Sequence, residues 1–197
     1  MDSMKTLQAP ASRPVFEANF PWDRPLSWED LQSIPDDRHW AYEIVEGQLL
    51  VSPSRDSRHQ TCVLELAVLL HAACPKELEV IVSPFDFVPR DGYSLQPDVL
   101  VVDKSTVESR RTVAPPVLAV EVMSPSSRLA DTSLKRLVYE EHAVASYWII
   151  DPEPPSLLAL DLVDGRYVER GFVTGEQAYD AERPFPVSVV PARLVAK

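Results

Sequence analysis

A single acidic residue inside an apolar run constrains the fold of this chain most. The run Val117–Met123, VLAVEVM, is apolar at every position except Glu121. Short apolar runs rich in β-branched residues are typical of buried β-strands. An ionised carboxylate in a dry core is strongly destabilising unless a partner compensates for it. The sequence therefore predicts a buried strand and, beside it, a group that stabilises the carboxylate.

A second apolar run also carries an acid at its start. Pro97-Asp98 opens the run Val99–Val102, and proline suits the first residue of a strand because it cannot donate within the ladder. The interval between Asp98 and Glu121 leaves room for a turn and two neighbouring strands. If the strands are adjacent, the two carboxylates face a common point. Such oxygen ligands suit a hard divalent cation, Mg²⁺ or Mn²⁺, which keeps several waters and substrate oxygens.

Glu46 is the third candidate acid. It lies beside Gly47, at the turn between the expected strands 42–47 and 48–52, where a side chain can point into a cleft. The alternative is an ordinary solvated turn acid. Glu43 alternates with Glu46, and we expect it to be exposed.

Lys135 is the candidate cation. Asp131, Lys135 and Tyr139 are spaced four apart and share one row of the helix expected over 128–142. That row borders the apolar arc through Val138, so Lys135 can reach back over the preceding strand. The alternative is a lysine that extends along the surface and pairs with Asp131.

Polar residues also gather where a loop enters the helix expected over 59–73. Arg58, His59 and Gln60 occupy this position, and a helix N-terminus can bind phosphate. His59 can alternatively act as a cap or a base. The remaining histidines show no ligand spacing for zinc, and no G-x-S-x-G motif is present.

The pattern of strands and helices predicts an α/β fold with a central mixed β-sheet flanked by helices. A short helix is expected from the capping box Ser27–Asp30, and Asp164-Gly165 predicts a C-terminal hairpin. Further strands are expected at 79–83, 85–89, 98–103, 117–123, 146–151 and 187–190. Residues 1–20 lack periodicity and are interpreted as a flexible N-terminal arm, and 21–197 as a single domain.

Composition limits the function. The formal net charge of −11 argues against a protein that coats nucleic acid through a basic surface, although a local basic groove remains compatible with it. There is neither a P-loop nor a GxGxxG motif. The absence of an export signal and of an apolar run of about 18 residues predicts a cytoplasmic protein that does not enter a membrane.

The chain resembles the Uma-type family of putative restriction endonucleases, within the PD-(D/E)XK nuclease superfamily. The resemblance covers about Ala41 to Glu153 and rests on three motifs in order: YEIVEGQLLVSPSRDSRHQ, QPDVLVVD and PPVLAVEVMSPSSRLADTSLKRLVYEEHAVASYWIIDPE. It implies a restriction-endonuclease-like core, extended by N-terminal strands and the C-terminal hairpin. It also implies metal-dependent hydrolysis of DNA phosphodiester bonds.

The resemblance also implies the roles of single residues. Asp98 matches the PD motif and Glu121 the acid of (D/E)XK, while the third position of that motif is Met123 instead of lysine. Lys135 from the next helix matches the lysine, and Glu46 matches the acid on the first strand pair. Asp98, Glu121 and Glu46 are thus the expected metal ligands and, with Lys135, the expected catalytic residues.

Two further expectations concern partners and alternatives. Arg58, His59 and Gln60 are expected to contact substrate, and a homodimer is expected because specificity would have to come from loops, a partner or a second copy. The alternatives are a catalytically inactive interaction or scaffold protein with a nuclease fold, motivated by the charge of −11, and a hydrolase of a smaller phosphoester.

Overall fold

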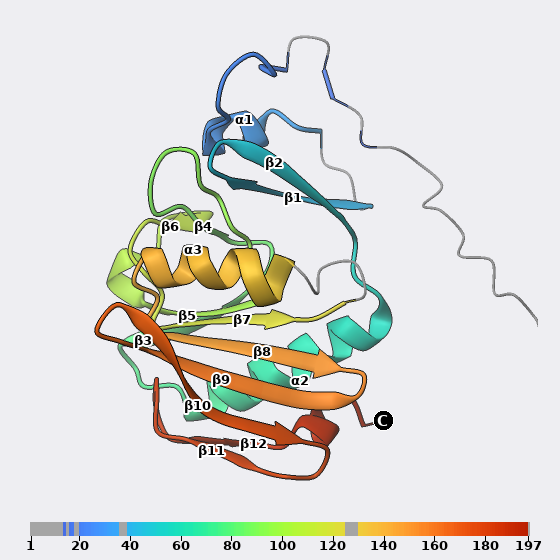
Figure 1. The fold of residues 1–197 in the computed structure, drawn as a ribbon, viewed down its shortest axis with the longest axis vertical. Helices are drawn as coiled ribbons and strands as arrows, with labels where there is room; N and C mark the ends of the chain where they lie inside the picture. Colours follow the sequence, from blue (N-terminus) through green and yellow to red (C-terminus); the bar gives the residue numbers. More distant parts are fainter. Residues whose placement is uncertain (1–13, 15, 18–19, 36–38, 125–129, 197) are drawn as a thin grey trace, which may run out of the picture.

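A six-stranded mixed sheet forms the centre of the protein in the computed structural model (Figure 1). The structure describes residues 14, 16–17, 20–35, 39–124 and 130–196. The strand order is β10-β9-β8-β7-β5-β3, and only the β7–β8 pair is parallel. These strands span Leu78–Val82 (β3), Val99–Asp103 (β5), Leu118–Val122 (β7), Ser146–Pro152 (β8), Pro155–Val163 (β9) and Arg166–Thr174 (β10).

Three small two-stranded sheets surround the central sheet. They are formed by the antiparallel pair β1 (Trp40–Val45) and β2 (Gln48–Pro53), the parallel pair β4 (Asp86–Phe87) and β6 (Arg111–Thr112), and the antiparallel pair β11 (Tyr179–Ala181) and β12 (Val187–Val189). The β1–β2 hairpin turns at Glu46 and Gly47, both with positive φ, as the glycine predicts.

The helical segments lie on both sides of the sheet. They are α1 (Trp28–Gln32), α2 (Ser57–Ala73), the π-helix η2 (Ala130–Lys135), α3 (Arg136–Glu141), and the short 3₁₀ helices η1 (Lys104–Thr106) and η3 (Pro191–Leu194). The capping box at Ser27 is present, with the Ser27 N–H donating to Asp30 Oδ2 at 2.8 Å. None of the described helices is long and apolar enough to span a membrane.

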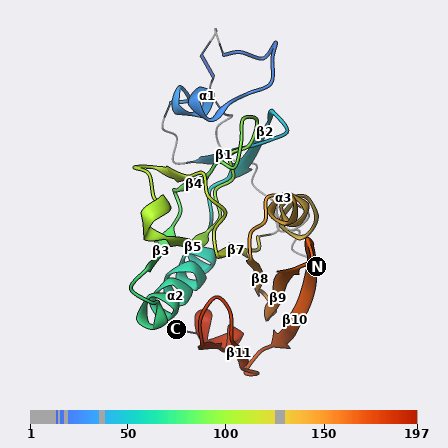
Figure 2. The same cartoon turned by 90° about the vertical axis from the view of Figure 1, so that its left-hand side faces the viewer.

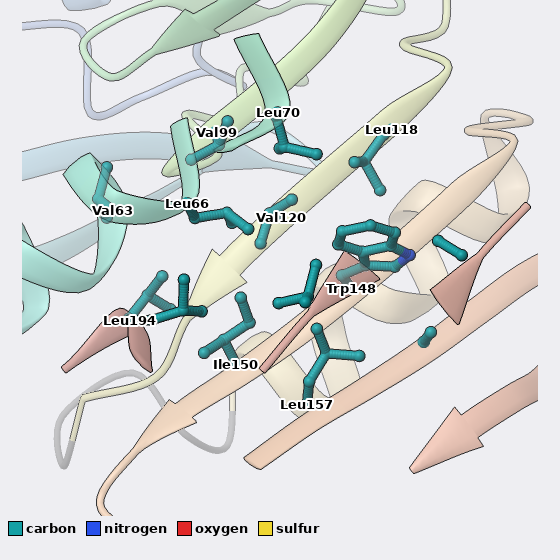
Figure 3. Packing of buried hydrophobic residues seen from close by; sticks show 14 of the residues in the cluster. Val63, Leu66, Leu70, Val99, Leu118, Val120, Trp148, Ile150, Leu157 and Leu194 are labelled. Carbon is teal, nitrogen blue, oxygen red and sulfur yellow. The ribbon is translucent and has the colours of Figure 1, made fainter. Parts of the chain in front are cut away.

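Alternation along the strands divides the core into two layers. Val99 and Val101 of β5 pack in the layer of α2, where Leu66 and Trp148 are fully buried (Figure 3). Leu100 and Val102 of β5 pack in the other layer. This layer contains α3, which lies on the face of the sheet opposite α2 (Figure 2). The β7 residues on either side of Glu121 pack in the α2 layer. Because neighbouring side chains of a strand point to opposite faces, the Glu121 side chain lies in the α3 layer.

The predicted α/β architecture is confirmed, including the mixed sheet, the N-terminal strand pair and the C-terminal hairpin turning at Asp164-Gly165. One expectation needs correction: the helix expected over 128–142 contains a π-helical first part. The helix expected over 59–73 is α2, which is covered on one side only, with Leu64 and Val68 about 60% exposed. Much of the arm assigned to 1–20 lies outside the described residues. The division into an arm and one domain stays a prediction.

The two sides of α2 give a direct test of the core. Leu66→Ala should destabilise the protein by about 2–5 kcal/mol, because Leu66 is 0% exposed and its removal leaves a cavity. Leu64→Ala, two residues earlier and 60% exposed, should change stability by less than about 0.5 kcal/mol. Urea unfolding of both variants measures the difference, and equal losses would contradict the assigned faces of α2.

Candidate active site

Asp98 and Glu121 lie at facing positions of two neighbouring strands. β5 and β7 are antiparallel, with Val99 opposite Val120, and each acid lies one residue beyond this pair. Asp98 is 4% exposed and Glu121 is 0% exposed. The predicted adjacency of the two acid-bearing strands is therefore confirmed, and both carboxylates lie in the interior.

The group that stabilises Glu121 is a pair of donors from the following helical segment. Lys135 Nζ lies 3.0 Å from Glu121 Oε1, and the Tyr139 hydroxyl donates to the same oxygen at 2.7 Å. Both residues lie on the row expected from their spacing, although Lys135 ends the π-helix η2 and Tyr139 belongs to α3. Burial, reinforced by the Glu121 charge, raises the pKa of Tyr139 well above its usual value, so its hydroxyl stays a proton donor. The Asp131 side chain, the alternative partner of Lys135, lies outside the described part of the chain.

Lys135 is held by a second carboxylate that was expected to be exposed. Glu43 of β1 is 5% exposed, and its Oε2 lies 2.9 Å from Lys135 Nζ. Its other oxygen, Oε1, accepts the backbone N–H of Gln96 at 2.7 Å. The ammonium, itself 2% exposed, thus lies between Glu43 and Glu121. The expectation of an exposed Glu43 is wrong, because β1 is covered by the loop that carries Gln96.

Glu46 is placed elsewhere. Its backbone has φ 52° at the β1–β2 turn, its side chain is exposed, and it lines a surface pocket with Arg90 and Tyr93. The turn that made Glu46 attractive as a site residue directs it away from the interior, where Glu43 lies. Of the two acids, the structure brings Glu43 to Lys135. Glu46 stays outside the cluster of charged residues formed by Glu43, Asp98, Glu121 and Lys135.

Asp98 is held by His59 and by the neighbouring strand. His59 Nε2 lies 3.1 Å from Asp98 Oδ2, and the Val122 N–H donates to the same oxygen at 2.8 Å. Asp56 caps α2 by accepting the His59 N–H at 2.9 Å, which fixes the histidine in the first helical turn.

The surroundings of Asp98 favour its ionised form. Burial raises the pKa of Asp98, but the hydrogen bond and charge of His59, together with Arg55 and Lys135, outweigh burial and lower it. Within the described part of the chain, Asp98 Oδ1 makes no hydrogen bond.

The other two residues expected to contact substrate lie at the surface. Arg58 forms an ion pair with Glu153, and Gln60 is exposed on α2. Arg55, in the loop before α2, donates to Ser124 Oγ at 3.3 Å. Of the predicted group Arg58, His59 and Gln60, only His59 reaches the acids.

The charges of the cluster fit a divalent cation. Formally, Glu43, Asp98 and Glu121 bring three negative charges against the ammonium of Lys135. Among the described residues no three His, Cys, Asp or Glu side chains are grouped to hold a metal by themselves. Two carboxylates nevertheless suffice for Mg²⁺, which takes its other ligands from water and substrate.

Exchanging each glutamate for glutamine tests which one belongs to the cluster. Glu43→Gln should destabilise the protein by about 3 kcal/mol, because it leaves part of the buried Lys135 charge uncompensated. Glu46→Gln, with an exposed side chain, should change stability by less than about 0.5 kcal/mol. Urea unfolding gives both values, and a larger loss for Glu46→Gln would contradict the assignment.

Comparison with known proteins places this chain in a family. One solved structure with the same fold is the crystal structure of a putative nuclease belonging to DUF820 from Anabaena variabilis ATCC 29413, with a TM-score of 0.66 and 17% sequence identity over 87% of this chain and 98% of that chain. No curated protein matches. The family model Uma2, described as "Putative restriction endonuclease", matches residues 28–193. The chain therefore belongs to the Uma2 family of putative restriction endonucleases.

Proposed function

We propose that this protein is a nuclease that hydrolyses DNA phosphodiester bonds with the aid of Mg²⁺ or Mn²⁺. The observation that carries the proposal is the placement of two buried acids, Asp98 and Glu121, one residue beyond the Val99–Val120 pair of neighbouring strands, with Lys135 Nζ 3.0 Å from Glu121 Oε1. Membership in a family described as putative restriction endonucleases supports it. So does the description of the Anabaena protein with the same fold as a putative nuclease.

Asp98 and Glu121 would hold the cation. The lowered pKa of Asp98 and its Oδ1 atom, which makes no hydrogen bond within the described residues, suit it as a ligand. A bound Mg²⁺ would polarise a phosphoryl oxygen and lower the pKa of a bound water. His59 would keep Asp98 in one orientation through its contact at 3.1 Å.

Lys135 would act on the reacting group directly. Its Nζ would orient the attacking water or stabilise the negative charge that develops on the phosphate. Glu43 would hold the ammonium from the opposite side at 2.9 Å, so that its position does not depend on substrate. A preorganised charge of this kind needs no reorganisation during the reaction.

The substrate would approach over the loop that precedes α2. Arg55 supplies positive charge beside Ser124 and the first turn of α2, where His59 lies, while the Arg58 charge is paired with Glu153. This local charge would attract a phosphate backbone to an otherwise acidic protein. A homodimer would present two such centres to the two strands of a duplex.

The acidity of the chain favours a second candidate. A net charge of −11 opposes binding to a polyanion, and it suits an interaction protein that keeps the nuclease fold without cutting. In that case the Lys135 pairs serve stability alone. Metal binding separates the two candidates, because the second requires no cation between Asp98 and Glu121.

Plasmid cleavage tests the proposal. Wild-type protein with Mg²⁺ or Mn²⁺ should nick or linearise supercoiled DNA, and EDTA should abolish the activity. Asp98→Asn and Glu121→Gln should each lower the rate at least about 100-fold, because each removes a ligand of the cation that would stabilise the charge developing on the phosphate. Asp161→Asn is a matched control, since Asp161 is a buried carboxylate that lines a separate pocket with Arg170 and Tyr179.

The outcomes are distinct. Equal products from wild type and Glu121→Gln would overturn the assignment of this site. Cleavage of single-stranded DNA or nucleotides but not of duplex would move the activity to a smaller phosphoester. No cleavage, together with no calorimetric signal for Mn²⁺, would support the interaction protein.

A further inference from the structure

A buried carboxyl outside the proposed metal site has no role in the function proposed above. Asp86 of β4 is 8% exposed and makes no salt bridge within the described part of the chain. Its Oδ2 accepts the Trp28 indole N–H at 2.7 Å, and its Oδ1 accepts the Gln96 side-chain amide at 3.1 Å. Burial raises the pKa of Asp86, against the effect of these two hydrogen bonds. Burying a carboxyl group costs free energy. The two hydrogen bonds that hold Asp86 in the interior therefore indicate its role.

Gln96 connects this carboxyl to the cluster. Its side chain is bound to Asp86, and its backbone N–H donates to Glu43 Oε1 at 2.7 Å. The same residue immediately precedes Pro97-Asp98, so its position also sets where the strand with the first acid begins. Gln96 thus contacts Glu43, the partner of Lys135, through its backbone N–H, and it contacts Asp86 through its side-chain amide.

The contact with Gln96 also determines where the Glu43 carboxylate points. One oxygen is held by the Gln96 N–H, which leaves the other directed at Lys135 Nζ at 2.9 Å. A glutamate has three rotatable side-chain bonds, and only contacts at both ends of its carboxylate fix it in one orientation. An error of about 1 Å at a reacting group is enough to lower a rate about 100-fold.

We infer that Asp86 and Gln96 are positioning residues that hold Glu43, and through Glu43 the Lys135 ammonium, against the two acids of the site. The inference rests on the proposed nuclease function for its kinetic consequence. The structural part of the inference, that Lys135 is held in place, does not depend on nuclease activity. Neither residue touches substrate in this scheme, so the inference concerns the rate of the chemical step and not binding.

Exchanging the side-chain amide of Gln96 and the carboxyl of Asp86 tests the contact between them. Gln96→Glu keeps the backbone N–H but sets a carboxylate against Asp86, so the two groups repel each other. We expect kcat to fall about 10- to 100-fold, with KM within about threefold because no substrate contact is lost. The double variant Asp86→Asn/Gln96→Glu again places an amide opposite a carboxylate, and the Trp28 N–H keeps an acceptor. Recovery of kcat to within about threefold of wild type is expected.

A second measurement does not require nuclease activity. Competitive labelling of amines, read by mass spectrometry, compares buried Lys135 with exposed Lys104 in the same sample. Gln96→Glu should raise the Lys135-to-Lys104 labelling ratio about fivefold or more, a change on the scale of 1 kcal/mol in local restraint, and the double variant should restore it. Asp161→Asn should leave both the ratio and kcat unchanged.

A milder variant covers the case in which Gln96→Glu does not fold. Trp28→Phe removes only the indole N–H bond to Asp86 and keeps an aromatic ring in place. It should raise the labelling ratio about twofold, roughly the effect of weakening one hydrogen bond at a distance.

The results separate the two proposals. An unchanged labelling ratio in folded Gln96→Glu or Trp28→Phe overturns the positioning role, whatever the activity. Cleavage by wild type with kcat unaltered in Gln96→Glu also overturns it, while the nuclease function stands. A ratio that rises and is restored as expected supports the positioning role even if wild type does not cut DNA, and the nuclease function alone then fails.

Discussion

A buried ammonium between two carboxylates connects the parts of this protein. Lys135 lies in the connection between β7 and β8, Glu121 belongs to β7, and Glu43 belongs to the N-terminal hairpin outside the main sheet. Removing one member of such a group leaves an uncompensated charge in the interior, which costs several times more than an exposed ion pair contributes. The hairpin is therefore fixed to the sheet by electrostatics as well as by packing.

The sheet provides the rigid frame of the same site. Pairing of β5 with β7 brings Asp98 and Glu121 together, and the cap of α2 by Asp56 sets His59 beside Asp98. Lys135 comes from the end of the π-helical turn, a form of helix found often at functional sites. Because the lysine comes from this turn, an apolar residue can occupy the position two residues after Glu121. That residue is Met123, which packs in the apolar core.

Local patterns in the sequence were sufficient for the strands, the long helix and the two acids on neighbouring strands. Glu43 was missed because the choice between Glu43 and Glu46 rested on the turn at Gly47. Exposure of a strand residue depends on what covers it, and the covering loop at Gln96 is about fifty residues away in the chain. The signal was present, since Glu43 precedes the buried pair Ile44-Val45 much as Glu121 interrupts its own apolar run. The strands β6 and β11, with two and three residues, are too short to show a period.

The wide spacing of the cluster along the chain has a consequence for the timing of assembly. Glu43, Asp98, Glu121 and Lys135 meet only when the hairpin, the central strands and the π-helical turn are all in place. No fragment that ends before Lys135, and none that starts after Glu43, contains the full set. A chain emerging from the ribosome would hold the acids without their counter-charge until Lys135 arrives, before β8, β9 and β10 are made. The site would thus stay incomplete until the π-helical turn has joined the hairpin and the first central strands.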